Sequence, residues 1–219
     1  MQKNINIQTG QPTILDFDMQ RISQRINIVF NIRTEGNIKR EDLSAPIIEL
    51  SGACGRFNIA DACLDTTRLY RMAHQVQPDE FTQTGEGTYR CVVHFHTLGV
   101  IPSAAKGHLN GPGILQVALQ VSTPQLDSSG APVLDEEGNP VKNSRYIYGA
   151  INPYDELTAA QLIEVRNGKI YLRYSKEDVN IEITTPLVIK ADQIVPNDTG
   201  MGWQPHDPTN PDDDIIIEI

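Results

Sequence analysis

The chain has 219 residues, a net charge of −10 and a pI near 4.9, with 39% apolar and 21% charged residues. This length and composition fit one large all-β domain or two small ones and exclude a disordered chain. The acidic balance argues against nucleic acid and anionic membrane surfaces as partners, because both carry negative charge themselves.

The N-terminal residues contain two short strand patterns, over 5–8 and 13–17, and lack the apolar segment of a signal peptide. We therefore expect either an intracellular protein or an export segment that lies outside this chain. No stretch reaches the roughly 18 continuous apolar residues of a membrane span, so we expect no membrane span.

Alternation of apolar and polar residues dominates the chain and predicts half-buried strands. The longest pattern covers 20–32, where Ile22, Ile26, Ile28, Phe30 and Ile32 share one face. Further patterns cover 46–50, 56–59, 89–97, 115–121, 179–183 and 187–190. They predict an antiparallel β-sandwich, transthyretin- or immunoglobulin-like, with at most one or two short helices.

A repeat of eight residues separates two of these strands. Residues 126–133 (LDSSGAPV) are followed at once by 134–141 (LDEEGNPV). Each copy has the Asp-x-x-Gly pattern of a turn, so the pair predicts an exposed loop or protruding hairpin. Calcium binding by Asp127, Asp135 and the adjacent glutamates is the alternative, although the spacing does not match an EF-hand loop.

Two local signals follow the repeat. Asn152, Pro153 and the acidic residues after them are typical of a helix start, which predicts a helix of about two turns up to residue 161. Asn167-Gly168 lies between two apolar runs and predicts a tight hairpin, because both central turn positions need a positive φ.

The C-terminal region changes character. Residues 195–214 are rich in Pro, Gly, Asn and Asp and predict an extended linker. The linker is followed by a β-branched strand, 215–219, which would be prone to aggregation if it stayed unpaired. We therefore divide the chain into a β-sandwich body over 1–194, with a candidate sub-boundary near 75–87, a linker over 195–214 and a terminal strand over 215–219. The candidate strand-pairing residues are Ile215, Ile216, Ile217 and Ile219.

No known catalytic pattern stands out, so we predict no enzyme, no cofactor and no metal site. The sequence contains no nucleophile elbow, phosphate loop, dinucleotide fingerprint or His-Glu-x-x-His. His94 and His96 share one strand face, as a metal pair would require, but no third ligand follows at a fitting spacing. Three cysteines, Cys54, Cys63 and Cys91, favour buried thiols over a disulfide framework, with a Cys54–Cys63 bridge left open.

Aromatic residues give the remaining candidates. Trp203 is the single tryptophan and lies in the predicted linker, where it either anchors the linker to the body or serves as an exposed binding residue. The pair Tyr146 and Tyr148 is a second candidate platform for a glycan.

Several stretches resemble the fimbrillin-type surface proteins of Bacteroidales bacteria, which include accessory and anchor subunits of their pili. Residues 18–30 (DMQRISQRINIVF) resemble the long strand of that family, 48–59 resemble the short segment that follows it, and the tether with its terminal strand resembles the family's C-terminal region. The resemblance implies a transthyretin-like sandwich, surface exposure and polymerisation by strand exchange. The chain lacks a lipidation cysteine near Met1 and is shorter than a two-domain fimbrillin, which favours a trimmed or divergent subunit over an anchor.

Three functions follow as hypotheses. The first is a non-enzymatic structural or adhesive pilus subunit, located at the cell surface, that pairs strands with copies of itself or with other subunits. The second is a virion structural protein of a gut bacteriophage, which would be made without a signal peptide. The third is a glycan-binding β-sandwich.

Overall fold

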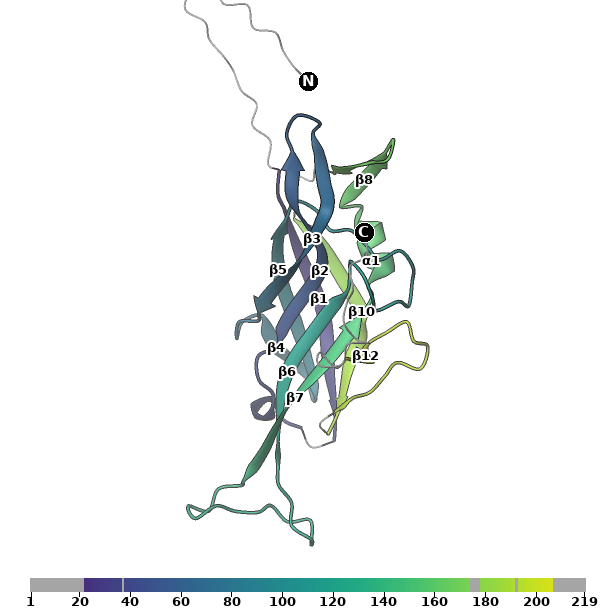
Figure 1. Cartoon of the computed structure of the whole chain (residues 1–219). Helices are drawn as coiled ribbons and strands as arrows, with labels where there is room; N and C mark the ends of the chain where they lie inside the picture. The colour runs from purple at the N-terminus through teal and green to yellow at the C-terminus, as the bar shows by residue number, and fades with distance from the viewer. Residues whose placement is uncertain (1–21, 37, 174–177, 192, 207–219) are drawn as a thin grey trace, which may run out of the picture.

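The computed structural model describes residues 22–36, 38–173, 178–191 and 193–206 (Figure 1). These residues form two sheets, one short α-helix and one 3-10 helix. Sheet A has the strand order β11-β10-β1-β5-β4, and sheet B has the order β12-β7-β6-β2-β3-β9-β8. The elements are β1 (Gln24–Glu35), η1 (Arg40–Asp42), β2 (Ile47–Asn58), β3 (Cys63–Gln75), β4 (Phe81–Gly85), β5 (Thr88–Thr97), β6 (Leu115–Pro124), β7 (Lys142–Ile151), α1 (Tyr154–Ala160), β8 (Ile163–Arg166), β9 (Lys169–Leu172), β10 (Val179–Lys190), β11 (Gln193–Ile194) and β12 (Gln204–Pro205). The predicted all-β sandwich with at most one or two short helices is confirmed.

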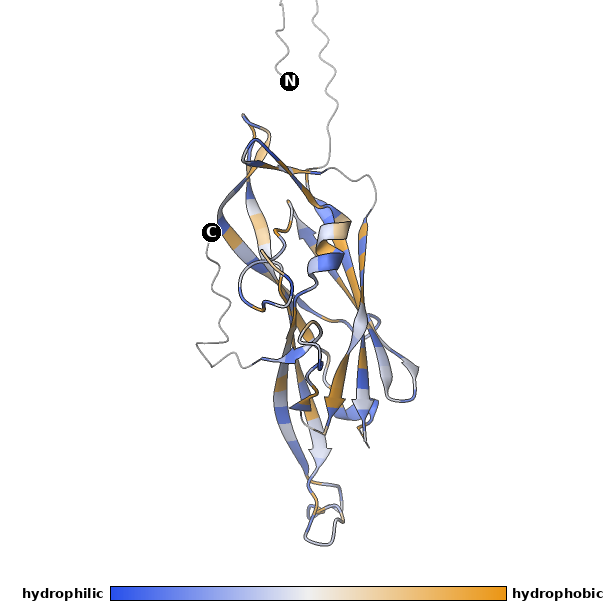
Figure 2. Ribbon diagram, turned by 90° about the vertical axis from the view of Figure 1, so that its right-hand side faces the viewer, coloured by the Kyte–Doolittle hydropathy of each residue, from blue (hydrophilic) through white to orange (hydrophobic). Residues whose placement is uncertain are grey.

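The core lies between the two sheets, as the alternation predicts. In β1, Ile26, Ile28, Phe30 and Ile32 are fully buried, while the residues between them lie on the outer face. Figure 2 shows the same alternation of orange apolar and blue polar residues along the strands. One continuous cluster joins β1 and β5 of sheet A to β2, β6 and β7 of sheet B. This cluster also contains Val76, Phe81 and Tyr89, so 75–87 is not a boundary between two cores.

One strand pair departs from the expected antiparallel arrangement. β1 and β10 run parallel, from Ile26 opposite Val179 to Glu35 opposite Lys190. A parallel pair needs a long connection between its strands, and here nearly the whole sandwich separates the two in the chain. The predicted strands 179–183 and 187–190 form one strand, β10, with an irregular register opposite Phe30 and Ile32.

A bulge explains why β2 reads as two short patterns. Its register against β3 shifts between Leu50 and Ala53, and Gly52 in this gap has a φ of +83°. A Cβ atom at Gly52 would lie 2.7 Å from the backbone N of Gly113 and from the backbone O of Ile101. Glycine is therefore required here, and the bulge breaks the alternation within one continuous strand.

Two arms leave the sandwich in opposite directions (Figure 1). β2 pairs with β6 only over Ile47–Leu50, so the rest of β2 continues with β3 past the start of β6. β6 runs the other way and pairs with β7 out to Pro124 and Lys142. We call residues 56–65 the β2–β3 arm and residues 122–144 the β6–β7 arm. The molecule is therefore elongated, with a projection at each end.

The two local predictions in the second half have different outcomes. The Asn167-Gly168 hairpin is confirmed, with φ values of 50° and 72° between β8 and β9. The helix is present as α1, but Asn152 does not cap it: the N-cap is Pro153, and the Asn152 side chain donates to the carbonyl oxygens of Ala105 and His108 instead. These two carbonyl groups belong to the loop before β6, so Asn152 holds that loop against the body.

Candidate functional site

The predicted strand-pairing residues Ile215, Ile216, Ile217 and Ile219 lie outside the described residues. What the structure does show is an edge in sheet A. Within residues 178–206, β10 pairs on its outer side only with β11, at Ile189 and Lys190. The first part of β10, from Val179 to Ile183, pairs with β1 and with no second strand of the described chain. An unpaired edge can accept an added strand, and here that strand would have to fit beside α1, which contacts β10.

Trp203 is buried, with only 1% of its surface exposed. Its ring packs on Phe30 at a centroid distance of 5.2 Å, and its Nε1–H donates to the carbonyl oxygen of Thr185 at 3.0 Å. The prediction of an extended linker is therefore wrong for its described part, 195–206, because β12 pairs with β7 and Trp203 enters the core. Burial also excludes Trp203 as an exposed binding platform.

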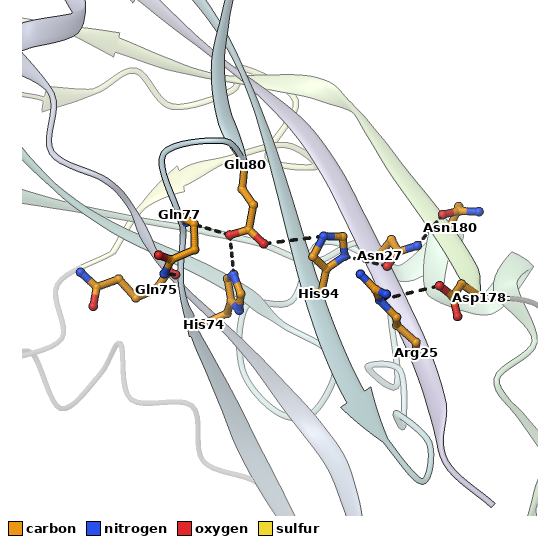
Figure 3. A network of polar contacts seen from close by, with 9 residues as sticks. All are labelled: Arg25, Asn27, His74, Gln75, Gln77, Glu80, His94, Asp178 and Asn180. Atoms are coloured by element: carbon orange, nitrogen blue, oxygen red, sulfur yellow. Dashed lines mark hydrogen bonds and ion pairs between the residues drawn. The ribbon is translucent and has the colours of Figure 1, made fainter. Parts of the chain in front are cut away.

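The structure brings together a polar network that links the two sheets (Figure 3). Glu80, just before β4, bridges two histidines: its Oε2 lies 2.8 Å from Nε2 of His74 on β3, and its Oε1 lies 3.6 Å from Nε2 of His94 on β5. The backbone N–H of Gln77 donates to the same Oε2 at 2.7 Å. Since β3 belongs to sheet B and β5 to sheet A, the Glu80 carboxylate connects the two sheets of the sandwich.

The network continues across the outer face of sheet A. Nδ1 of His94 lies 2.7 Å from Oδ1 of Asn27, and Nδ2 of Asn27 donates to Oδ1 of Asn180 at 2.8 Å. These contacts hold the ring of His94 between Oδ1 of Asn27 and the carboxylate of Glu80.

Electrostatics agree with an ionised Glu80. Burial raises the pKa of this carboxyl, but the hydrogen bond from His74, the backbone N–H of Gln77 and the nearby histidines lower it more, and the net pKa lies below its usual value. The lowered pKa of Glu80 favours a structural role for this carboxylate over one as a catalytic acid or base, because an acid–base catalyst needs a pKa near neutrality.

The predicted pair of His94 and His96 is not brought together on a ligand. His94 is half-buried in the network, whereas His96 is exposed two residues further along the same face. Among the described residues, no group of three His, Cys, Asp or Glu side chains is arranged to hold a metal ion. No sequence pattern points to His74 and Glu80, because the turn that brings them beside His94 has no characteristic residue spacing.

The three cysteines are free and buried. Burial, with a smaller effect of Asp65, raises the pKa of Cys54 to about 11, and burial together with Glu80 raises the pKa of Cys91 to about 12. Both thiols therefore stay protonated at neutral pH and are poor nucleophiles. Cys91 also faces the core, whereas His94 lies on the opposite face of β5.

The repeat builds the same exposed turn twice at the tip of the β6–β7 arm. Oδ1 of Asp127 accepts from the backbone N–H groups of Ser129 and Ala131, and Oδ1 of Asp135 accepts from those of Glu137 and Asn139. These bonds bind each carboxylate to its own turn, so both aspartates have a structural role. Leu126 and Leu134 remain 59% and 58% exposed.

A groove lies on the outer face of sheet B. Tyr146 and Tyr148 stack there with ring centroids 6.3 Å apart, and cavities of about 230 Å³ and 420 Å³ adjoin Tyr148 on its two sides. The smaller cavity is also lined by Ile47, Glu49, Arg71, Gln116 and His206. The predicted tyrosine platform therefore lies beside polar side chains from β2, β3, β6 and the residue after β12.

Helices capable of crossing a membrane are not found in the described part of the chain. Comparison with known proteins finds no matching family model, no matching curated protein and no matching solved structure. The fimbrillin resemblance therefore stays a prediction, and function must be argued from the geometry.

Proposed function

We propose that this protein is a non-enzymatic structural or adhesive subunit that joins other protein subunits, including copies of itself, into a larger assembly. The observation that carries the proposal is the pair of arms at opposite ends of an elongated body, each with exposed apolar side chains at its tip. Contacts at two different ends are heterologous and build open chains of subunits.

The tips of both arms favour a role in subunit contacts, because they expose apolar side chains and have a defined structure. Ile59, at the turn of the β2–β3 arm, is 85% exposed, and Leu126 and Leu134 protrude from the β6–β7 arm. Both tips are held by internal hydrogen bonds: Asn58 Oδ1, for example, accepts from the backbone N–H groups of Ala60 and Asp61. Exposed apolar residues on ordered turns favour contact with a partner, because the ordering cost has already been met by the fold.

The same geometry supports strand pairing as the mode of attachment. A strand donated by a neighbour would add to the open edge of β10, where main-chain hydrogen bonds provide affinity. Donation of 215–219 to this edge is the form that the fimbrillin resemblance implies, and a cell-surface pilus is the corresponding assembly. A phage virion remains the alternative assembly, and both fit an elongated two-ended subunit.

Assembly of the purified full chain tests the proposal. We expect size-exclusion chromatography with light scattering, and negative-stain images, to show oligomers that grow with concentration. Ile59→Ser, or Leu126→Ser combined with Leu134→Ser, should raise the concentration needed for assembly about tenfold or more. Met201→Ser, which removes an exposed apolar side chain away from both tips, is the control.

Two results would contradict self-assembly through the arms. One is a chain that stays monomeric at every concentration. The other is assembly that both arm variants support as well as the wild type does. The genes beside the coding sequence then separate the two kinds of assembly, since capsid or tail genes favour the virion and an in-frame export signal favours the pilus.

A further inference from the structure

The groove on the outer face of sheet B lies on the side of the body, between the two arms. It is therefore separate from the arm tips that we propose as subunit contacts, and it can serve a second function. Cross-strand pairing sets its residues side by side: Ile47 of β2 lies opposite Ala118 of β6, and Ala118 lies opposite Tyr148 of β7. Residues that face each other in this way lie about 5 Å apart on one face of a sheet. One continuous surface therefore runs from Ile47 to Tyr148.

Ala118 makes this surface concave. It is the small residue between two large ones, Ile47 and Tyr148, and it lines the cavity of about 230 Å³ between them. A longer side chain at this position would fill the cavity. The floor of the groove thus depends on a methyl group, and its walls are an isoleucine on one side and an aromatic ring on the other.

The aromatic wall extends beyond this cavity. Tyr146 stacks on Tyr148 with an interplanar angle of 25°, and Tyr146 is 55% exposed. Tyr148 and His206 line both cavities, and the backbone N–H of His206 donates to the carbonyl oxygen of Tyr148 at 2.9 Å. β12 and His206 therefore fix the second cavity directly beside the first, so an elongated ligand could contact both tyrosines.

Polar groups with both donors and acceptors surround the apolar surface. Nε2 of Gln116 lies 2.9 Å from Nε2 of His206, and Glu49 is the cross-strand neighbour of Gln116. Arg71 lines the same cavity. In the smaller cavity one acidic side chain, Glu49, offsets one basic side chain, Arg71, and the larger cavity is also lined by Arg145.

We propose that this groove binds a neutral oligosaccharide, with sugar rings stacked on Tyr148 and Tyr146 and hydroxyl groups bonded to Gln116, Glu49 and Arg71. A sugar ring has an apolar C–H face and a rim of hydroxyl groups that both donate and accept, and the groove offers the complement of each. Convergent polar groups around an apolar, concave surface are typical of ligand sites. In the smaller cavity Glu49 offsets Arg71, which disfavours an anionic sugar at that position.

Binding is tested by amide chemical-shift changes in ¹H–¹⁵N NMR spectra of the full-length chain carrying Leu126→Ser and Leu134→Ser, because assembly of the wild type would broaden its amide signals. The probes are maltotetraose, cellotetraose, mannotetraose and N-acetylchitotetraose, with sialyllactose and a heparin tetrasaccharide as anionic comparisons. We expect at least one neutral probe to bind with saturable shifts at residues of the groove. Tyr148→Ala and, separately, Ala118→Gln should each weaken that Kd at least about tenfold.

Tyr171→Ala is the matched control, because Tyr171 is a half-buried tyrosine on β9 that contacts Arg166 and does not line the groove. It should leave the Kd unchanged. Ala118→Gln keeps the aromatic wall intact, so it tests the cavity even if Tyr148→Ala unfolds. Failure of every neutral probe to bind overturns the proposal, as does tighter binding of the anionic probes or binding that survives both groove variants. Subunit assembly should persist when the groove substitutions are made in the wild-type chain, which separates this site from the arms.

Discussion

At the scale of single residues, Glu80 is important for stability, because its carboxylate connects the two sheets, which share no strand pairing within the described residues. It contacts His74 from sheet B and His94 from sheet A, and its surroundings leave only 13% of the side chain exposed. Removing one partner from a part-buried charge pair leaves the other uncompensated, so each member matters more than an exposed ion pair would.

The Glu80 bridge should make stability depend on pH. The pKa of Glu80 is lower in the folded protein than the usual value of 4.5, so the unfolded chain takes up the proton first as the pH falls. The bridge therefore stabilises the fold above pH 4.5. This stabilisation is lost as the pH falls through the pKa of Glu80 in the folded protein. Below it, the neutral Glu80 side chain no longer places a negative charge beside the two histidine rings, whose centroids lie 6.4 Å apart. We expect Glu80→Gln to lower the free energy of unfolding by about 1–3 kcal/mol at pH 7, and by much less at pH 3.

Urea denaturation at pH 7, 5 and 3 measures this effect. Glu86→Gln is the control, because Glu86 is an exposed glutamate in the turn between β4 and β5. Its cost should be small at all three pH values. If Glu80→Gln lowers the free energy of unfolding by the same amount at all three pH values, the ionised Glu80 bridge is not the cause of the pH dependence.

At the scale of elements, the segment from β11 to β12 behaves as part of the sandwich. Its composition indicated a linker, yet Trp203 packs on Phe30 and β12 pairs with β7 beside Gly149. A Cβ atom at Gly149 would lie 2.6 Å from Cδ1 of Ile194, so glycine makes room for the segment to dock. A single tryptophan can therefore outweigh an otherwise loop-like composition.

Replacing Trp203 should release this segment. Trp203→Ala removes the ring and the hydrogen bond to Thr185, so we expect a loss of about 3–5 kcal/mol in unfolding free energy and a lower Tm. Limited proteolysis should then cut within 195–206 before the body is cleaved. Met201→Ala is the control, because Met201 is an exposed residue of the same segment. Equal protease resistance of the wild type and Trp203→Ala would contradict the anchoring role.

The sequence predicts those features that depend on neighbours in the chain. The alternation over 24–32, the Asn167-Gly168 turn and the repeat at 126–141 each correspond to an observed strand, hairpin or protrusion, because side-chain period and turn chemistry are local, whereas Ile22 lies outside β1 and is 45% exposed. The parallel pairing of β1 with β10 and the His74–Glu80–His94 network depend on residues distant in sequence. No local pattern encodes such pairings, and the site was therefore only partly foreseen, through His94 and the two tyrosines.

At the scale of the whole molecule, the sandwich separates four surfaces that can work independently. The two arms point away from each other along the long direction (Figure 1). The tyrosine groove lies on the outer face of sheet B, and the unpaired edge of β10 belongs to sheet A. Such a division lets a subunit bind its neighbours at the ends or along an edge while one face stays accessible.

Deleting residues 212–219 tests whether the predicted terminal strand pairs within its own chain or with a neighbouring subunit. If the strand pairs within its own chain, its removal exposes a sheet edge and lowers the Tm of the monomer, since pairing and apolar contacts are lost together. If the strand is donated to a neighbour, the monomer keeps its Tm and assembly is abolished. Replacing Ile216 and Ile217 with serine at full length should reproduce whichever result is found, because it removes the apolar contacts and keeps the chain length. Assembly that persists in a truncated protein with an unchanged Tm would end the strand-pairing hypothesis and leave the arms as the sole basis for subunit contacts.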